Sequence, residues 1–246
     1  MLRGLYTATS GMLVQEIRSE LVSNNLANVE TVGYHRQTAQ IKAFPEMLLS
    51  RIHNQDKTKI GTLGTGAVVE RSGSSFQQGR LHTTSNPLDV ALMGAGFFVV
   101  AGPTGNRYTR DGGFTLSQAG WLVNQNGQRV LGESGPIFIG QGEVTIDSLG
   151  NVHVDGEFRD RLLIVEFPNR AGLIRQGSSQ YEATPEAGAP FRYNTTVVQG
   201  ALEYSNVNII NEMVNMITIQ RSYEANQKVI QAYDETLGKA VNEIAG

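Results

Sequence analysis

The longest stretch of helical hydrophobic spacing in this chain occupies its last 42 residues, from Ser205 to Gly246. Positions at alternating intervals of four and three form a seam there, and most of them are apolar: Ile209, Met213, Met216, Tyr223, Ile230, Leu237, Val241 and Ile244. Three polar residues complete the same seam, Gln220, Gln227 and Asp234. This heptad spacing is typical of a helix that pairs with another helix. It predicts a helix over residues 207–244, roughly 55 Å long, whose seam must be covered by another segment or another copy.

A second helical pattern lies at the beginning of the chain, over residues 2–28. Its apolar face consists of Leu5, Met12, Leu13, Ile17 and Leu21. Two glycines in the first half, Gly4 and Gly11, each cost about 1 kcal/mol relative to alanine in a helix interior. This helix would be marginal alone, so we expect it to pack against the C-terminal helix.

An asparagine cluster ends the first helix, with Asn24, Asn25 and Asn28 followed by Gly33 and Tyr34. Asparagine tolerates left-handed backbone geometry and bonds the chain locally, so the cluster predicts a helix stop and a turn. Gly33 would supply a positive φ angle in that turn. Because amides both donate and accept hydrogen bonds, the cluster also suits a junction between subunits. The spacing leaves both interpretations open.

The middle of the chain has the pattern of a β domain. Between residues 36 and 75 an extended or loop connector is expected. Short strand-like runs and closely spaced turn signals then extend from residue 76 to 200. Residues 114–120 and 144–150 repeat one strand-and-turn design, which favours antiparallel hairpins in a meander or barrel-like sheet.

These patterns together predict an α+β protein. Its N- and C-terminal helices pair as a coiled coil and flank a central, mainly antiparallel β domain. The expected divisions are the N-terminal helix (1–35), the connector (36–75), the β-rich outer domain (76–200) and the C-terminal helix (201–246).

Composition narrows the function classes. The net charge of −3 argues against a generic nucleic-acid binder, and no segment has the 18 continuous apolar residues of a membrane-spanning helix. The absence of cysteine removes thiol catalysis, cysteine-ligated zinc and disulfides. No cleavable signal peptide is visible at the N-terminus, so export would need another route.

No arrangement of residues in the sequence predicts an enzyme. The four histidines lie at none of the usual metal-ligand spacings, and the glycine-rich residues 60–67 lack the Gly-Lys-Ser/Thr ending of a phosphate loop. Four acidic residues cluster at Asp147, Asp155, Glu157 and Asp160, and we interpret them as hairpin turns. We therefore expect no catalytic residue, no metal site and no cofactor.

Motifs at both ends and in the middle resemble the axial proteins of the bacterial flagellum, the rod and hook proteins of the hook–basal body. The N-terminal match is Ala8-Thr9-Ser10-Gly11-Met12, Ser23-Asn24-Asn25-Leu26-Ala27-Asn28-Val29 and Gly33-Tyr34. The C-terminal match is Glu203-Tyr204-Ser205-Asn206-Val207-Asn208, Glu212 to Ile217 and Gln220 to Asn226. Leu88 to Leu92, Gly96-Phe97-Phe98 and Tyr108 to Gly112 add a central match.

This resemblance implies a structural subunit of the flagellar basal-body rod. Such a subunit assembles helically around the export channel, with its paired helices near the axis and its β domain outside, and carries torque from motor to hook. The implied partners are further copies, other rod and hook proteins, and the type III export apparatus, with no nucleic acid and no membrane insertion. The implied location is the basal body outside the cytoplasm. Proximal (FlgF-like) and distal (FlgG-like) rod types both remain open.

The residues expected at the assembly interface are Leu5, Met12, Leu13, Ile17, Leu21, Asn24, Asn25, Leu26, Asn28, Gly33, Tyr34, Ser205, Asn206, Val207, Met213, Met216, Ile217, Gln220, Arg221, Tyr223, Ile230 and Leu237. An alternative function is a secreted cell-wall-binding β domain that dimerises through its helical termini. A hydrolase that uses the acidic cluster is a third hypothesis.

Overall fold

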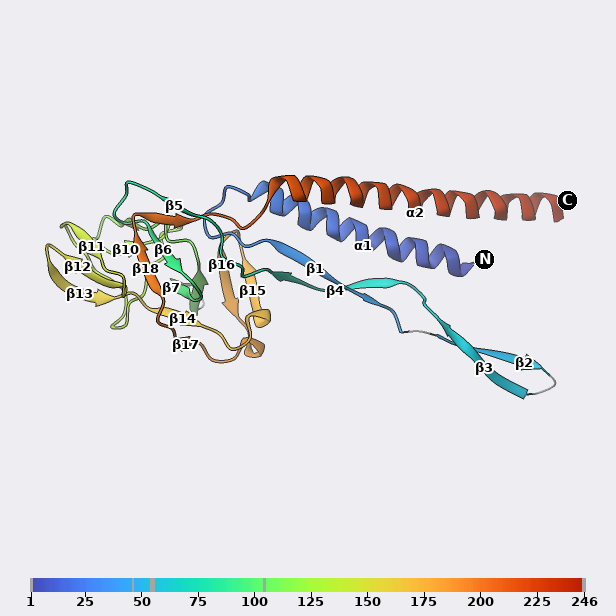
Figure 1. Ribbon diagram of the computed structural model, residues 1–246, viewed down its shortest axis with the longest axis horizontal. Coiled ribbons are helices and arrows are strands. Elements are labelled where there is room, and N and C mark those ends of the chain that lie inside the picture. The colour runs from blue at the N-terminus through green and yellow to red at the C-terminus, as the bar shows by residue number, and fades with distance from the viewer. Residues whose placement is uncertain (1, 46, 54–55, 104, 245–246) are drawn as a thin grey trace. The chain divides into compact units, whose positions relative to one another are not determined.

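The computed structural model describes residues 2–45, 47–53, 56–103 and 105–244. It contains an N-terminal helix, a C-terminal helix and a central antiparallel β region (Figure 1), which confirms the predicted α+β class. The chain divides into two compact units. We call them the helical unit (1–26, 37–73 and 209–246) and the β-rich unit (27–36 and 74–208).

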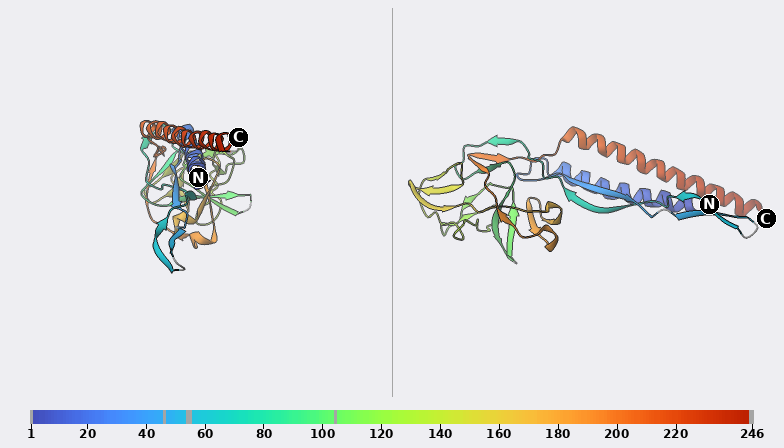
Figure 2. Two further views of the ribbon diagram at one scale, coloured as in Figure 1. Left: turned by 90° about the vertical axis from the view of Figure 1, so that its right-hand side faces the viewer. Right: turned by 60° about the horizontal axis from the view of Figure 1, so that its bottom comes forward.

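The two helices of the helical unit lie side by side and run in opposite directions (Figures 1 and 2). They are α1 (Leu2–Ala27) and α2 (Ile209–Ile244). A side chain at Gly4 would overlap the Tyr233 ring, and a Cβ at Gly11 would lie 3.0 Å from Asn226 Nδ2. Farther along, Ser19 Oγ donates to Met216 Sδ at 3.6 Å. The glycines that weaken α1 as an isolated helix thus provide the space into which α2 packs.

Extended strands, and no helix, fill the described part of the connector. The pairs are β1 (Gln37–Ala43) with β4 (Ala67–Ser74), and β2 (Met47–His53) with β3 (Asp56–Leu63). Ser10 on α1 accepts a hydrogen bond from Ala67 N at 3.4 Å, and a Cβ at Gly66 would overlap the Ser10 hydroxyl. The start of β4 therefore packs directly against α1.

The β-rich unit is built on a six-stranded antiparallel sheet in the order β15-β16-β8-β7-β14-β17. Its strands are β7 (Phe97–Gly102), β8 (Gly105–Thr109), β14 (Ile164–Glu166), β15 (Leu173–Gln176), β16 (Gln180–Ala183) and β17 (Phe191–Arg192). Two short 3-10 helices, η1 (Arg170–Gly172) and η2 (Pro185–Ala187), lie between these strands in the sequence.

Smaller antiparallel sheets complete this unit, and they include both predicted hairpins. One hairpin is β9 (Thr115–Leu116) with β10 (Leu122–Val123). The other joins β11 (Val144–Ile146) to β12 (Asn151–Val154), and β13 (Glu157–Arg161) adds a third strand. The remaining pairs are β5 (Leu81–Thr83) with β19 (Ala201–Glu203) and β6 (Val90–Met93) with β18 (Thr196–Gln199).

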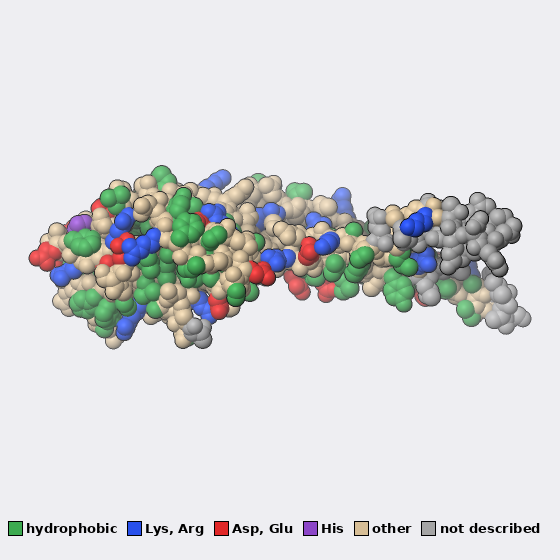
Figure 3. Space-filling model, turned by 90° about the horizontal axis from the view of Figure 1, so that it is seen from below, with side chains coloured by type: hydrophobic (Ala, Val, Ile, Leu, Met, Phe, Trp, Pro, Cys, Tyr) green, Lys and Arg blue, Asp and Glu red, His purple; other side chains and the backbone are tan. Residues whose placement is uncertain are grey.

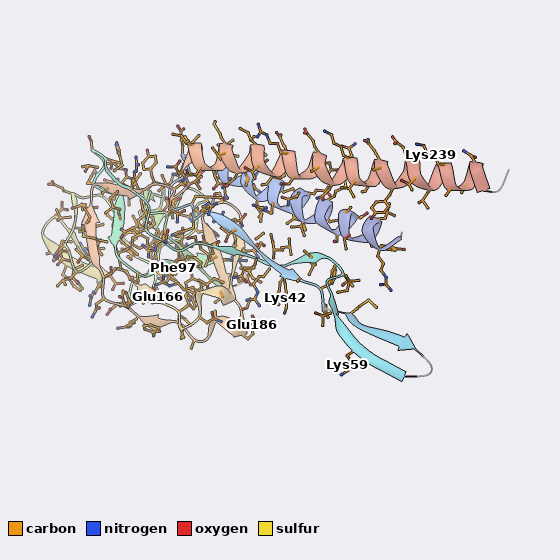
Figure 4. All side chains as sticks on the ribbon, turned by 45° about the vertical axis from the view of Figure 1, so that its right-hand side comes forward. Lys42, Lys59, Phe97, Glu166, Glu186 and Lys239 are labelled. Atoms are coloured by element: carbon orange, nitrogen blue, oxygen red, sulfur yellow. The ribbon has the colours of Figure 1, made fainter. Side chains whose placement is uncertain are left out.

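Two hydrophobic cores fill the β-rich unit, because successive side chains of β7 point to opposite faces of the sheet. Phe98 and Val100 belong to one core, and Phe97 and Val99 belong to the other. Figure 4 shows Phe97 in the interior, where its ring contacts those of Phe76, Phe167 and Tyr181. A strand buried on both faces explains the continuous apolar run in this part of the sequence.

Glu203, at the end of β19, connects distant segments of the β-rich unit. Its carboxylate accepts hydrogen bonds from Gly79 N at 2.9 Å and Arg110 NH1 at 3.1 Å, and its carbonyl accepts one from Gly33 N at 2.8 Å. Both charged side chains are buried, at 2% exposure for Glu203 and 3% for Arg110. A buried charge is tolerated only when it is paired and hydrogen-bonded, so each partner depends on the other.

Asn206, three positions after Glu203 in the sequence, adds further contacts to this network. Its side-chain oxygen accepts a hydrogen bond from Arg36 N at 2.7 Å, and its amide group donates to Ser75 O and Gln77 O at 2.8 Å each. Residues 203–206 thereby bind residues 33–36 and 75–79. These are the segments through which the chain continues into the helical unit.

Neutralising Glu203 should destabilise the β-rich unit severely. Glu203→Gln would leave the Arg110 guanidinium buried without a countercharge, a change that costs about 3–5 kcal/mol. The control is Glu157→Gln, which removes a carboxylate whose side chain is 77% exposed and should change the free energy of unfolding by less than about 0.5 kcal/mol. Denaturant unfolding monitored in the β-rich unit measures both. Equal effects of the two variants would contradict the role given to the ion pair.

Replacing Gly4 should weaken the contact between the helices. Gly4→Ala gains helix propensity but collides with Tyr233, and overpacking typically costs 1–3 kcal/mol. Gly238→Ala is the matched control, because nothing lies within 4 Å of a Cβ at that position and the change should stabilise α2 by about 1 kcal/mol. Hydrogen exchange of the helix amides should therefore show opposite changes. Equal protection in both variants would contradict the packing described for Gly4.

Candidate assembly interface

The asparagines at the end of α1 form local hydrogen bonds. Asn25 is 1% exposed, and its amide group donates to Gln37 O at 2.9 Å and accepts from Gln37 N at 2.7 Å. Asn28 Oδ1 accepts a hydrogen bond from Thr31 Oγ1 at 3.2 Å, and Asn28 O accepts one from Thr31 N. These two side chains thus stabilise the helix end and the turn. Asn24 is exposed, and Leu26 is half-buried.

Gly33 and Tyr34 lie inside the β-rich unit. Gly33 has the predicted positive φ, +67°, and a Cβ there would collide with the backbone of Asp111. Tyr34 is 2% exposed, and the Arg175 guanidinium carbon lies 4.0 Å from the centre of its ring. Both residues therefore hold the turn in place, and within one chain neither presents a surface to a partner.

His35 completes this buried region as a neutral side chain. Burial lowers the pKa of His35 to about 3, and the nearby positive charges of Arg110, Arg175 and Arg170 add to the effect. Its Nδ1 lies 3.3 Å from the Tyr181 hydroxyl, and the Phe76 ring lies 5.3 Å away. Arg175 also donates a hydrogen bond to the His35 carbonyl. This histidine is packed and uncharged at neutral pH, which suits a structural role.

Two of the four clustered acidic residues, Asp147 and Asp155, cap turns. Asp147 Oδ1 accepts hydrogen bonds from Leu149 N and Asn151 N, both at 2.9 Å. Asp155 accepts one from Glu143 N at 2.9 Å, consistent with its place at a hairpin. Across the described residues no group of three or more histidine, cysteine, aspartate or glutamate side chains could hold a metal ion. These hydrogen bonds agree with the predicted hairpin turns at Asp147 and Asp155. Glu157 and Asp160 lie instead in β13, where Asp160 is 8% exposed and accepts a hydrogen bond from Ser134 N.

The residues just before α2 form hydrogen bonds within the β-rich unit. Ser205 is 8% exposed, and its hydroxyl accepts a hydrogen bond from Val207 N at 3.2 Å. Asn206 holds the two segments described above, and Val207 is half-buried. The three predicted interface residues before α2 thus have clear structural roles inside the chain.

The remaining predicted interface residues lie on the helices and fall into two groups. The half-buried ones are Leu5, Met12, Leu21, Met216, Ile230 and Leu237. The exposed ones are Leu13, Ile17, Met213, Ile217, Gln220, Arg221 and Tyr223. The helical unit therefore keeps a set of large apolar side chains in contact with solvent.

The heptad seam predicted for α2 overlaps only in part with the face that the structure covers, since Met216, Ile230 and Leu237 are half-buried. The buried residues of α2 are Glu212 and Ile219, and Met216 between them contacts α1. Ile209, Gln227 and Asp234 of the predicted seam are exposed, and the side chain of Ile244 lies outside the described residues. Gly4 and Gly11 of α1 allow Tyr233 and Asn226 of α2 to approach closely, a contact that a count of apolar positions does not include.

An exposed apolar stripe on α2 lies opposite its covered face. We call Ile210, Met213, Val214 and Ile217 the α2 stripe; their exposed fractions are 73%, 51%, 56% and 51%. Their spacing of three, four and seven residues places them on one side of the helix. Sequence reasoning missed Ile210 and Val214, although this spacing was visible beside the heptad seam.

Among the described residues, no helix combines the length and the apolar character that a membrane span requires.

Three family models match parts of the sequence. The model of the flagella basal body rod protein matches residues 5–35, and that of the D1 domain of the flagellar hook protein FlgE/F/G matches residues 91–154. The model of the C-terminal region of the flagellar basal body rod FlgEFG protein matches residues 198–243. Together they match most of both helices and part of the central β region.

Similar proteins match over almost the full length of the chain. The flagellar hook-basal body complex protein FlhO of Bacillus subtilis is 35% identical, with 99% of each chain covered. The flagellar basal-body rod protein FlgG of Borreliella burgdorferi is 35% identical, with 98% of each chain covered. FlgG of Buchnera aphidicola from Schizaphis graminum is 34% identical, with 97% of this chain and 98% of the relative covered.

These relatives are structural proteins of the flagellum and not enzymes, and their full-length similarity supports the rod function over the cell-wall-binding alternative. The family associates with copies of itself and with other rod or hook proteins, in the flagellar basal body. The chain therefore belongs to the flagellar basal-body rod protein family, as a structural subunit of the rod.

Proposed function

We propose that this chain builds the rod by helical polymerisation through its two terminal helices. In this proposal α1 and α2 of each subunit pair as a coiled coil, and the α2 stripe docks onto the helices of neighbouring subunits. The single observation that carries the proposal is the exposure of four large apolar side chains on the face of α2 opposite Glu212 and Ile219. The antiparallel contacts from Gly4–Tyr233 to Ser19–Met216 support the pairing within one subunit.

The energetics favour a partner for the α2 stripe. A surface helix of a globular protein usually has one apolar and one polar face, whereas the first turns of α2 are apolar on the side away from α1 as well. Fully burying one valine, isoleucine or methionine stabilises by about 1.5–3 kcal/mol. Four such residues on one face would contribute substantially to association even if each were buried only in part.

The exposed polar residues of α2 would then determine how neighbouring subunits align. Gln220, Gln227 and Asp234 lie on the solvent side of the isolated chain. Polar residues at helix interfaces reduce stability but fix the register and the number of helices that associate. We propose this role for them, together with Arg221, in the contact between subunits.

The assembly that follows is a tube. A contact between two different surfaces that does not close into a ring generates a helical filament. We propose that residues 1–35 and 201–246 form the core of this tube around the export channel. Residues 36–75 would connect that core to an outer domain at 76–200. The rod so formed would transmit torque from motor to hook, after export through the flagellar type III apparatus to a site outside the cytoplasm.

Introducing charges into the α2 stripe should abolish assembly without unfolding the chain. In Ile210→Asp combined with Val214→Asp, both changes fall on exposed positions, so the melting temperature should stay nearly unchanged. Burying two carboxylates against a neighbouring helix would, in contrast, strongly oppose association. Electron microscopy of basal bodies should show truncated rods, and swimming should be lost.

The control is Ile174→Asp, which changes an isoleucine of similar exposure, 55%, in the β-rich unit. It should leave rods and swimming intact. Normal swimming by cells that carry the stripe variant at wild-type levels would contradict the proposed role of α2.

A further inference from the structure

The β-rich unit carries a second exposed surface, separate from the helices. We call it the basic aromatic patch and define it as Met93, Leu149, Arg161, Phe191, Arg192 and Tyr193. Four of these are large hydrophobic side chains, exposed by 54% at Met93, 59% at Leu149, 46% at Phe191 and 37% at Tyr193. Contiguous exposed apolar surface bordered by polar groups is typical of an interaction site.

The contacts of Arg161 join one side of this patch. Its Nε donates to Leu149 O at 2.9 Å, and its NH2 donates to Asn194 Oδ1 at 3.1 Å. Asn194 follows Tyr193, whose ring centre lies 6.5 Å from that of Phe191. Arg161 therefore connects the β11–β12 turn to the segment that contains β17.

Thr195 extends the patch in the other direction, since its hydroxyl donates to Met93 O at 2.9 Å. Strands β14 and β17 lie at the lower side of the β-rich unit in Figure 1. The view from below shows hydrophobic side chains there beside a mixed group of basic and acidic ones (Figure 3). Hydrogen bonds thus link the parts of the patch, which includes both apolar and charged groups.

The two arginines of the patch share one carboxylate. Glu133 lies between the two arginines, with Oε2 at 3.2 Å from Arg192 NH1 and Oε1 at 4.0 Å from Arg161 NH1. Two guanidinium groups face one carboxylate, in a chain whose net charge is −3. Because hydrogen bonds hold Arg161 in place, little conformational entropy would be lost when a partner binds.

The hollow within the patch is too small for a metabolite. Glu133, Arg161 and residues 162–164 and 192–195 line it, and it offers about 10 Å³, which is room for about one water molecule. Sites for small molecules typically enclose about 300–1,000 Å³. A broad protein surface therefore fits the patch better than a small ligand.

The position of β17 adds to this argument. It forms one edge of the six-stranded sheet, and proteins normally cover or otherwise protect the edges of their sheets. Arg192 and Tyr193 are of residue types that contribute most binding energy at protein interfaces, and phenylalanine, as at Phe191, is enriched there. The two residues of β17 and the residue that follows it are therefore suited to contact another protein.

We propose that the basic aromatic patch contacts a second copy of this chain. This inference rests on the proposed function, because the second copy is the partner that helical assembly supplies. Each copy is acidic overall, so it would meet the two arginines of the patch with complementary charge. The rod would then be held by a contact between β-rich units and neighbours, in addition to the contact through α2.

Photo-crosslinking between two copies tests the patch directly. p-Benzoylphenylalanine replaces Tyr193 in cells of the bacterium that makes this chain, which also produce a second copy with a different tag. Irradiation should give an adduct that carries both tags. Adding Phe191→Ser and Arg192→Glu should reduce its yield at least about tenfold, as expected for interface residues of these types. The same photoreactive group at Ile174, on the opposite edge strand, should give little of it.

The absence of the two-tag adduct, or an adduct only with a different protein, would overturn the inference. A parallel probe at Ile210 separates this result from failure of the proposed function. If Ile210 yields two-tag adducts and Tyr193 does not, the patch is not an interface but helical assembly stands. If neither position yields them, both proposals fail. Unchanged melting temperatures of the patch variants would show that a lost adduct does not reflect unfolding.

Discussion

The structure depends on one mismatch, namely that α2 has more apolar surface than its own chain can cover. Helix α1 has 26 residues and α2 has 36, which correspond to about 39 and 54 Å. One shorter helix can pack against only one face of a longer helix and along only part of its length. Small residues on α1 allow close contact with that face, and the α2 stripe is left on the other side. Association with further subunits, as proposed here, would cover that side too.

In the β-rich unit, a network of hydrogen bonds holds several distant chain segments together. The chain passes between the two units four times, and Glu203, Arg110 and Asn206 hold together three of the segments that lead to these crossings. The buried ion pair matters in this setting because removing either partner would leave the other charge buried without its countercharge. The motifs around Asn25 and Asn206, which resemble those of flagellar proteins, thus secure the chain itself. This gives a physical reason for their composition that does not require contact with another subunit.

Much of this architecture was predictable from the sequence. The long periodic segments gave both helices, and turn residues gave the hairpins β9–β10 and β11–β12. The covered face of α2 was not predictable, because its contacts involve Gly4, Gly11 and Ser19, which a hydrophobic pattern does not count. The pairing of Arg110 with Glu203 spans 93 residues and leaves no local signal. The spacing of the α2 stripe was visible in the sequence beside the heptad seam. Only the packing of α1 against α2 shows that the stripe is the pattern that stays exposed.

The central claim is that the α2 stripe is buried between subunits of the assembled rod. A density map of rods isolated from the bacterium that makes this chain, at a resolution that shows side chains, measures this directly. The account predicts that Ile210, Val214 and Ile217 contact helices of neighbouring subunits and lose their solvent exposure. A rod in which these three side chains face solvent, while subunits associate through other surfaces, would contradict it.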